Sequence, residues 1–84
     1  MHMTTPVLGS KLRQKRVISD NGLDIGYVLD AEFDASQAKL TAIIIKPEHE
    51  TKEIKEYVNE DHVLKIPYER VSAIGRHVIV KFPF

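Results

Sequence analysis

Apolar and polar residues alternate along the stretch from Ile25 to Asp34, and this period of two predicts a β-strand. The apolar residues occupy the odd positions, namely Ile25, Tyr27, Leu29, Ala31 and Phe33. Val28 breaks the alternation, and Gly26 precedes it by two positions. Because glycine inside a strand often marks a bend or a close backbone approach, we interpret Val28 as a β-bulge or as burial on a strongly curved sheet. The pattern therefore predicts a bent strand, which suits a small barrel.

Two turn signals flank this strand. Asn21-Gly22 follows the apolar pair Val17-Ile18 and predicts a hairpin whose two-residue loop has positive φ at both positions. The segment from Asp34 to Ala38 predicts a second turn, because Asp and Ser side chains close local hydrogen bonds to the backbone. The positions at which we expect backbone conformation to matter most are Asn21, Gly22, Gly26 and Gly75.

The next predicted strand, from Leu40 to Ile45, is apolar on both faces and stops at Pro47. In a small domain such a strand needs a second cover, which is either a neighbouring segment or another copy of the protein. We favour a second copy, and we predict a dimer interface formed by Ile43, Ile45 and Ile79.

Residues 48–62 are the most polar segment and allow two interpretations. Ile54, Tyr57 and Val58 have the spacing of one apolar stripe on a short helix. Residues 59–62, followed by the apolar stretch at 63–66, fit a hairpin equally well. The pattern leaves this choice open.

The last part of the chain predicts two strands around one helical turn. Alternate apolar residues define the strands, with Leu64, Ile66 and Tyr68 in the first and Val78, Val80 and Phe82 in the second. Between them, residues 69–75 fit one helical turn that points Val71 and Ile74 inward and ends at Gly75 with positive φ. The predicted fold class is all-β: a small, strongly bent antiparallel barrel of about six strands with one short helical turn near residues 69–75.

The composition restricts the class of protein. A chain of 84 residues makes one small domain, which we place at residues 12–84 after a flexible tail at residues 1–11. Met1-His2 before Met3 has the pattern of a cloning remnant. The absence of cysteine excludes disulfides and cysteine-ligated metals, and no apolar run reaches the roughly 18 residues that span a bilayer. These features predict a soluble, cytoplasmic protein.

The formal net charge is zero, but the charges are sorted along the chain. Residues 1–19 contain bases and no acid, and residues 20–34 contain acids and no base. Cross-strand pairing of the two segments is one interpretation, and a docking surface for a partner is the other. The residues that would form this partner surface are Asp30, Glu32, Asp34, Lys11, Arg13, Lys15 and Arg16.

The basic segment lacks the features that nucleic-acid and membrane binding require. It has no aromatic residue on which a base could stack, which argues against nucleic acid as a partner. Its cations lack an apolar face, so membrane attachment would be weak and sensitive to salt. We therefore expect contact with a membrane only through a partner protein.

No group of side chains predicts catalysis. Asp30, Glu32 and Asp34 share one face of a strand, but no second segment supplies further ligands for a metal. The histidines lack the spacing of a metal-binding pair, and the sequence contains neither a serine nucleophile motif nor a glycine-rich phosphate loop. We predict a non-enzymatic protein with no catalytic residue, no cofactor and no metal site.

The order of these features resembles a PRC-barrel domain. The resemblance rests on Asp20-Asn21-Gly22, on Ile25-Gly26-Tyr27-Val28 with Asp30 and Phe33-Asp34, on Leu40 to Ile45, and on the block Ile66-Pro67-Tyr68 to Ile74-Gly75. It covers residues 12 to 82. The sequence departs from the family at Gln14, where many members have glycine, and at Arg76, where many have aspartate. Both departures lie at strand ends.

The single-domain form resembles the small, stand-alone archaeal PRC-barrel proteins. This resemblance implies a homodimeric adaptor for cell division that links the ring of the tubulin-like division GTPase to a membrane-anchored partner. It also implies a cytoplasmic protein that is recruited to the division site. The alternative is an accessory factor for RNA processing or ribosome assembly, because the bacterial ribosome maturation factor carries a PRC-barrel half.

Overall fold

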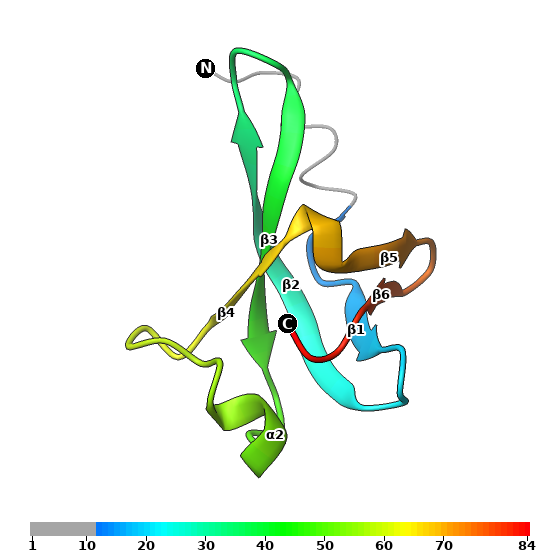
Figure 1. The fold of residues 1–84 in the computed structure, drawn as a ribbon, viewed down its shortest axis with the longest axis vertical. Coiled ribbons are helices and arrows are strands. Elements are labelled where there is room, and N and C mark those ends of the chain that lie inside the picture. Colours follow the sequence, from blue (N-terminus) through cyan, green and yellow to red (C-terminus); the bar gives the residue numbers. More distant parts are fainter. Residues whose placement is uncertain (1–11) are drawn as a thin grey trace.

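The computed structural model describes residues 12–84, which contain a six-stranded mixed sheet (Figure 1). The strands are β1 (Arg16–Ser19), β2 (Asp24–Asp34), β3 (Lys39–Pro47), β4 (Leu64–Pro67), β5 (Val71–Ile74) and β6 (Val78–Val80). One helical turn, α2 (Lys52–Lys55), follows β3, and a 3-10 turn, η1 (Tyr68–Arg70), follows β4. The expected tail at residues 1–11, including Met1-His2 and Lys11, lies outside the described residues. The all-β fold expected from the sequence is confirmed.

The strand order is β4-β3-β2-β1-β6-β5, so β4 and β5 are the two edges of the sheet. These edge strands are consecutive in the chain, and η1 joins them directly. The sheet bends strongly but does not close, which leaves a seam that η1 crosses. The expectation of a purely antiparallel sheet is wrong at one pair, since β1 and β6 are parallel. This pairing is possible because the intervening strands and turns supply the long connection that parallel strands need.

Bulges bend the long β2–β3 hairpin, which projects from the rest of the sheet (Figure 1). The β2–β3 register jumps from Val28 to Asp30 and so leaves Leu29 as an extra residue. As a result Val28 is 1% exposed and Leu29 is 39% exposed, although the alternation placed Leu29 with the apolar series. The bend expected at Val28 is confirmed, because a bulge shifts the faces of the strand by one residue.

Gly26 lies where the backbones of β2 and β3 come closest. A Cβ atom at this position would lie 1.9 Å from the backbone oxygen of Lys46 and 2.9 Å from the Cα of Pro47. Only a residue without a side chain fits this contact, which confirms the expectation of a close backbone approach.

The first turn differs in detail from the expectation. Ser19 N donates to the carbonyl of Leu23 at 2.9 Å, so Asp20, Asn21 and Gly22 form a three-residue loop instead of a two-residue one. Gly22 has a φ of 91°, whereas Asn21 has no positive φ. This is the three-residue arrangement in which a turn is followed by a left-handed glycine. It is preferred here because the Ser19 hydroxyl accepts a hydrogen bond from the Leu23 amide at 2.9 Å.

Ile43 and Ile45 lie in the core of a single chain and are 0% exposed. The prediction that they form a dimer interface is therefore wrong, since neither presents surface to a second copy. On the other face of β3, Ala42 is buried and Ile44 is half-buried, and the ion pair between Lys65 of β4 and Glu32 of β2 crosses this face at 2.9 Å. Ile79 is half-buried between its β-sheet partners Ile18 and Ala73.

The segment at residues 48–62 is helical in part and is not a hairpin. Ile54 in α2 is 1% exposed and belongs to the core, and after the helix Val58 packs against the core while Tyr57 is 37% exposed. The residues that follow η1 also differ from the expectation, because β5 replaces most of the helical turn expected at 69–75. Gly75 consequently has no positive φ. Within the described residues, no helix is long and apolar enough to cross a membrane.

Candidate interaction surface

Basic and acidic side chains from separate parts of the sequence meet at the surface of the sheet. Arg13 lies 3.9 Å from Asp30, and Lys65 pairs with Glu32 from two strands away. These side chains remain about half exposed or more, so each pair adds little to stability. The structure thus supports cross-strand pairing for these charges. Because these side chains are exposed, they remain accessible to a partner, and the partner surface expected from the sequence stays a prediction.

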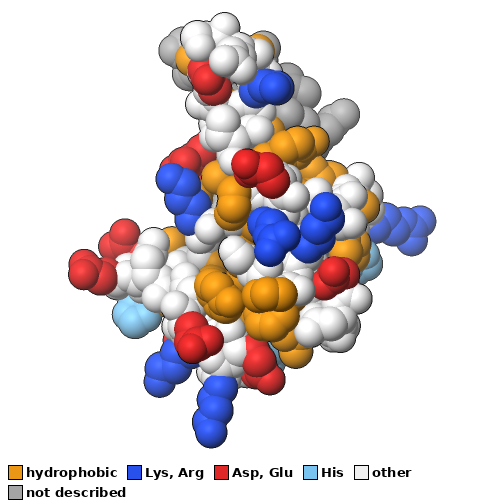
Figure 2. All heavy atoms as spheres, viewed as in Figure 1, with side chains coloured by type: hydrophobic (Ala, Val, Ile, Leu, Met, Phe, Trp, Pro, Cys, Tyr) orange, Lys and Arg blue, Asp and Glu red, His pale blue; other side chains and the backbone are white. Residues whose placement is uncertain are grey.

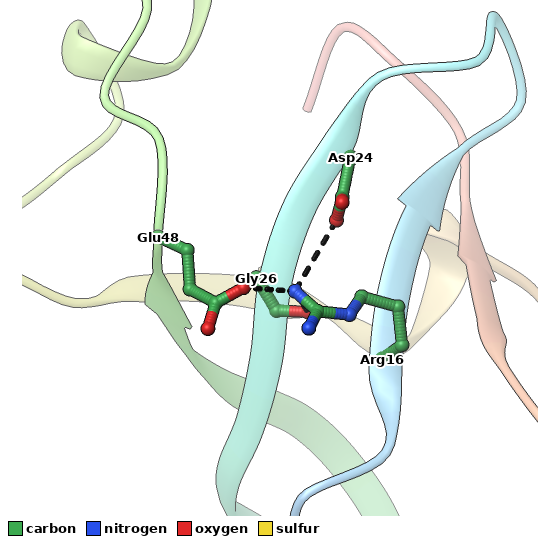
Figure 3. A network of polar contacts seen from close by, with 4 residues as sticks. All are labelled: Arg16, Asp24, Gly26 and Glu48. Atoms are coloured by element: carbon green, nitrogen blue, oxygen red, sulfur yellow. Dashed lines mark hydrogen bonds and ion pairs between the residues drawn. The ribbon is translucent and has the colours of Figure 1, made fainter.

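Arg16 is the centre of a polar network (Figure 3). Its guanidinium Nη1 donates to Glu48 Oε1, to Asp24 Oδ1 at 3.4 Å and to the Gly26 carbonyl at 3.5 Å. The hydrogen bond to Glu48 and the charges of Asp24 and Glu48 raise the pKa of Arg16 above its ordinary value. The network ties β1 to β2 and to the residue that follows β3. The charge of Arg16 is therefore used mainly in contacts within the sheet and is less available to a partner.

The other predicted partner residues make local contacts. Lys15 Nζ donates to the carbonyl of Gly75, which ties the residue before β1 to the turn after β5. Asp34 closes the β2–β3 turn by accepting hydrogen bonds from the Ser36 amide at 3.0 Å and the Ser36 hydroxyl at 2.7 Å. The hydroxyl bond is the main reason why the pKa of Asp34 is lowered. The main role of Asp34 is thus to stabilise this turn.

Replacing Ser36 with alanine should raise the pKa of Asp34 toward its ordinary value. A carboxyl group with a lowered pKa in the folded state stabilises the protein above its unfolded pKa, and it loses this contribution as the pH falls through the folded pKa. The contribution therefore disappears below about pH 4. An NMR titration of the Asp34 side chain measures the change, with Ser72→Ala as control. An unchanged Asp34 pKa in Ser36→Ala would show that the hydroxyl bond does not form in solution.

An apolar groove lies at the seam of the sheet, and we call it the seam groove. Its volume is about 690 Å³, and the lining residues that matter here are Leu12, Lys39, Leu40, Tyr68, Glu69 and Ile74. Tyr68 is 49% exposed and Ile74 is 43% exposed. Hydrophobic side chains beneath the projecting hairpin and beside the C-terminal segment are visible on the face drawn in Figure 2.

Sequence reasoning missed the seam groove because it placed Tyr68 and Ile74 on the inner face. Ile74 pairs with Val78 and so shares its side of the sheet, but Val78 is fully buried and Ile74 is not. The difference arises because no strand closes over Ile74 at the edge. The exposure of Ile74 follows from where the sheet ends, and the sequence pattern does not show that position.

A second apolar feature was also missed. The rings of Tyr57, Phe82 and Phe84 pack edge to face, with centroids 5.2 to 6.0 Å apart. This arrangement is favourable for aromatic pairs and covers the end of the core between α2 and β6. No local period connects these residues, so the sequence pattern could not bring them together.

Among residues 12–84, His, Asp and Glu side chains do not gather in groups of three or more that could hold a metal ion. In the same part of the chain, every buried side-chain nitrogen and oxygen has a hydrogen-bond partner. The surface therefore offers charge pairs and an apolar groove, which are suited to contacts between proteins.

These features define a class of small, bent all-β domain with an open apolar seam. The sequence matches the family described as the PRC-barrel domain over residues 6–84, and the chain belongs to this family. The resemblance found in the sequence is confirmed at the level of the family. Comparison with curated proteins gives no significant match. Membership of the PRC-barrel family supports a small protein-interaction module as the general function.

Proposed function

We propose that this protein is a non-enzymatic adaptor of archaeal cell division. The observation that carries the proposal is the exposed apolar seam groove on a PRC-barrel domain. A patch of this kind marks a contact site more often than a reaction site, because apolar surface gains most by being covered. The likeness of its sequence to archaeal PRC-barrel adaptors supports the assignment to division.

The adaptor acts as a homodimer in the cytoplasm and is recruited to the division site. One partner is the tubulin-like division GTPase, and the other is a membrane-anchored protein, so contact with the membrane is indirect. Arg13, Lys15 and the acids beside them form the surface for these partners. The same arrangement weighs against RNA, because Arg13 and Arg16 lie beside carboxylates that reduce their attraction for phosphate.

Affinity capture from cells of the source organism tests this function. We expect the tagged full-length protein to recover the division GTPase or its membrane-anchored partner. The double variant Arg13→Gln/Lys15→Gln should recover several-fold less, because it removes two cations from the partner surface. Lys52→Gln/Lys55→Gln on α2 is the matched control, since it removes the same charge elsewhere and should leave recovery unchanged.

Recovery of ribosomal proteins or RNA would instead support the ribosome-assembly alternative. Recovery of neither group by the wild-type protein would overturn the division assignment. Equal recovery by the two double variants would leave the adaptor role in place and remove Arg13 and Lys15 from its partner surface.

A further inference from the structure

The seam groove runs beside a strand edge that has no partner. Pairing of β3 with β4 ends at Ala42 and Pro67, whereas pairing of β3 with β2 continues to Lys39. The outer backbone groups of residues 39–41 therefore have no strand beside them in the described part of the chain. Open backbone groups of this kind are a template for pairing with another chain.

The apolar side chains that line the groove form a continuous surface from the buried core to the exposed exterior. Tyr68 and Ile74 are the two most exposed of the large hydrophobic residues in the described chain. Leu12, which is 2% exposed, and Leu40, which packs against the core, line the same groove. An occupant that covered Tyr68 and Ile74 would bury apolar surface continuous with the core, which is a favourable contact for association.

The charges at the groove indicate which occupant fits. Lys39 and Glu69 both line it, and neither is part of an ion pair among residues 12–84. A strongly acidic or strongly basic partner would be attracted by one of these residues and repelled by the other. A second copy related by a two-fold axis can place each Lys39 beside the other copy's Glu69, which makes two identical attractive pairs.

We propose that the seam groove is the surface through which two copies of this chain associate. The inference rests on the proposed homodimeric adaptor and names the surface that the dimer uses. Tyr68 and Ile74 provide the apolar centre of the contact, and Lys39 and Glu69 provide its orientation. The interface is isologous, so the same residues act twice.

Charge reversal tests this arrangement by sedimentation velocity over a range of protein concentrations. Lys39→Glu and Glu69→Lys, each alone, replace two attractive pairs with two repulsive ones and should weaken dimerisation roughly 10-fold. The double variant Lys39→Glu/Glu69→Lys should restore it. An equimolar mixture of the two single variants should form a heterodimer, because both of its charge pairs are again attractive.

Two further variants separate the interface from general effects. Ile74→Asp should abolish the dimer while circular dichroism and cooperative unfolding remain. Lys55→Glu on α2, at the end of the molecule away from the projecting hairpin (Figure 1), should leave it unchanged.

Three results would overturn the proposal. One is a wild-type protein that sediments as a monomer at all concentrations. The second is a dimer that is unaffected by the charge reversals, which would leave the dimer in place but at another surface. The third is a mixture of single variants that does not associate. If the wild-type protein is a monomer but still captures the division partners, the proposed adaptor function stands without the dimer. If Ile74→Asp loses that capture, the groove binds a partner protein instead of a second copy.

Discussion

Replacing Gly26 with alanine should lower the free energy of unfolding by about 3 kcal/mol or more. The added Cβ would lie 1.9 Å from the Lys46 backbone oxygen, and a backbone atom cannot rotate away as a flexible side chain can. The β2–β3 pairing on either side would have to separate, and this hairpin is the longest in the sheet. A chain of this length has a total stability of roughly 4 to 12 kcal/mol, so the loss is a large part of it.

Urea denaturation followed by circular dichroism measures this effect. Gly75→Ala is the matched control, because a Cβ there meets no atom within 4 Å and the residue has no positive φ. We expect the control to change stability by no more than about 0.5 kcal/mol. If both variants were equally stable, the close approach of β2 and β3 would not exist in solution.

Replacing Ile43 with alanine should cost about 2 to 5 kcal/mol. Ile43 is 0% exposed and belongs to the core cluster with Ile45, Leu64 and Ile66. Truncation removes apolar contacts and leaves a cavity that the paired strands on both sides of β3 cannot fill by moving. Leu29→Ala, at the exposed bulge residue, should cost clearly less.

The Ile43 variant also separates a core role from the dimer role expected from the sequence. A core residue lowers stability by the same amount at every protein concentration, whereas loss of an interface residue makes the midpoint of unfolding less dependent on concentration. We expect the first behaviour. A change of less than about 1 kcal/mol in Ile43→Ala would contradict its place in the core.

Local sequence patterns were sufficient to predict the bent β2–β3 hairpin. Val28 breaks the alternation and Gly26 is a glycine inside the strand, and the structure has a bulge beside the first and a close backbone approach at the second. The turn at Asp34 to Ala38 was predicted for the same reason, because its hydrogen bonds lie within a few residues. The family resemblance then indicated the same class of fold as the strand pattern.

Features that depend on distant pairing could not be predicted in this way. The burial of Ile43 and Ile45 depends on the pairing of β3 with β4, which sets them beside Ile66 and Leu64 and does not follow from the period of β3 itself. The exposure of Ile74 depends on where the sheet ends. The seam groove, which is the main candidate site, is therefore a property of the open topology, and the sequence pattern of β5 gave no sign of it.

An adaptor of this kind must hold two partners at once. The most direct measurement is sedimentation of the purified full-length protein with the tubulin-like division GTPase and the membrane-anchored partner of the same organism, singly and together. We expect a binary complex with each partner and a larger complex when all three are mixed. Absence of binding to either partner, or displacement of one partner by the other, would contradict the adaptor function.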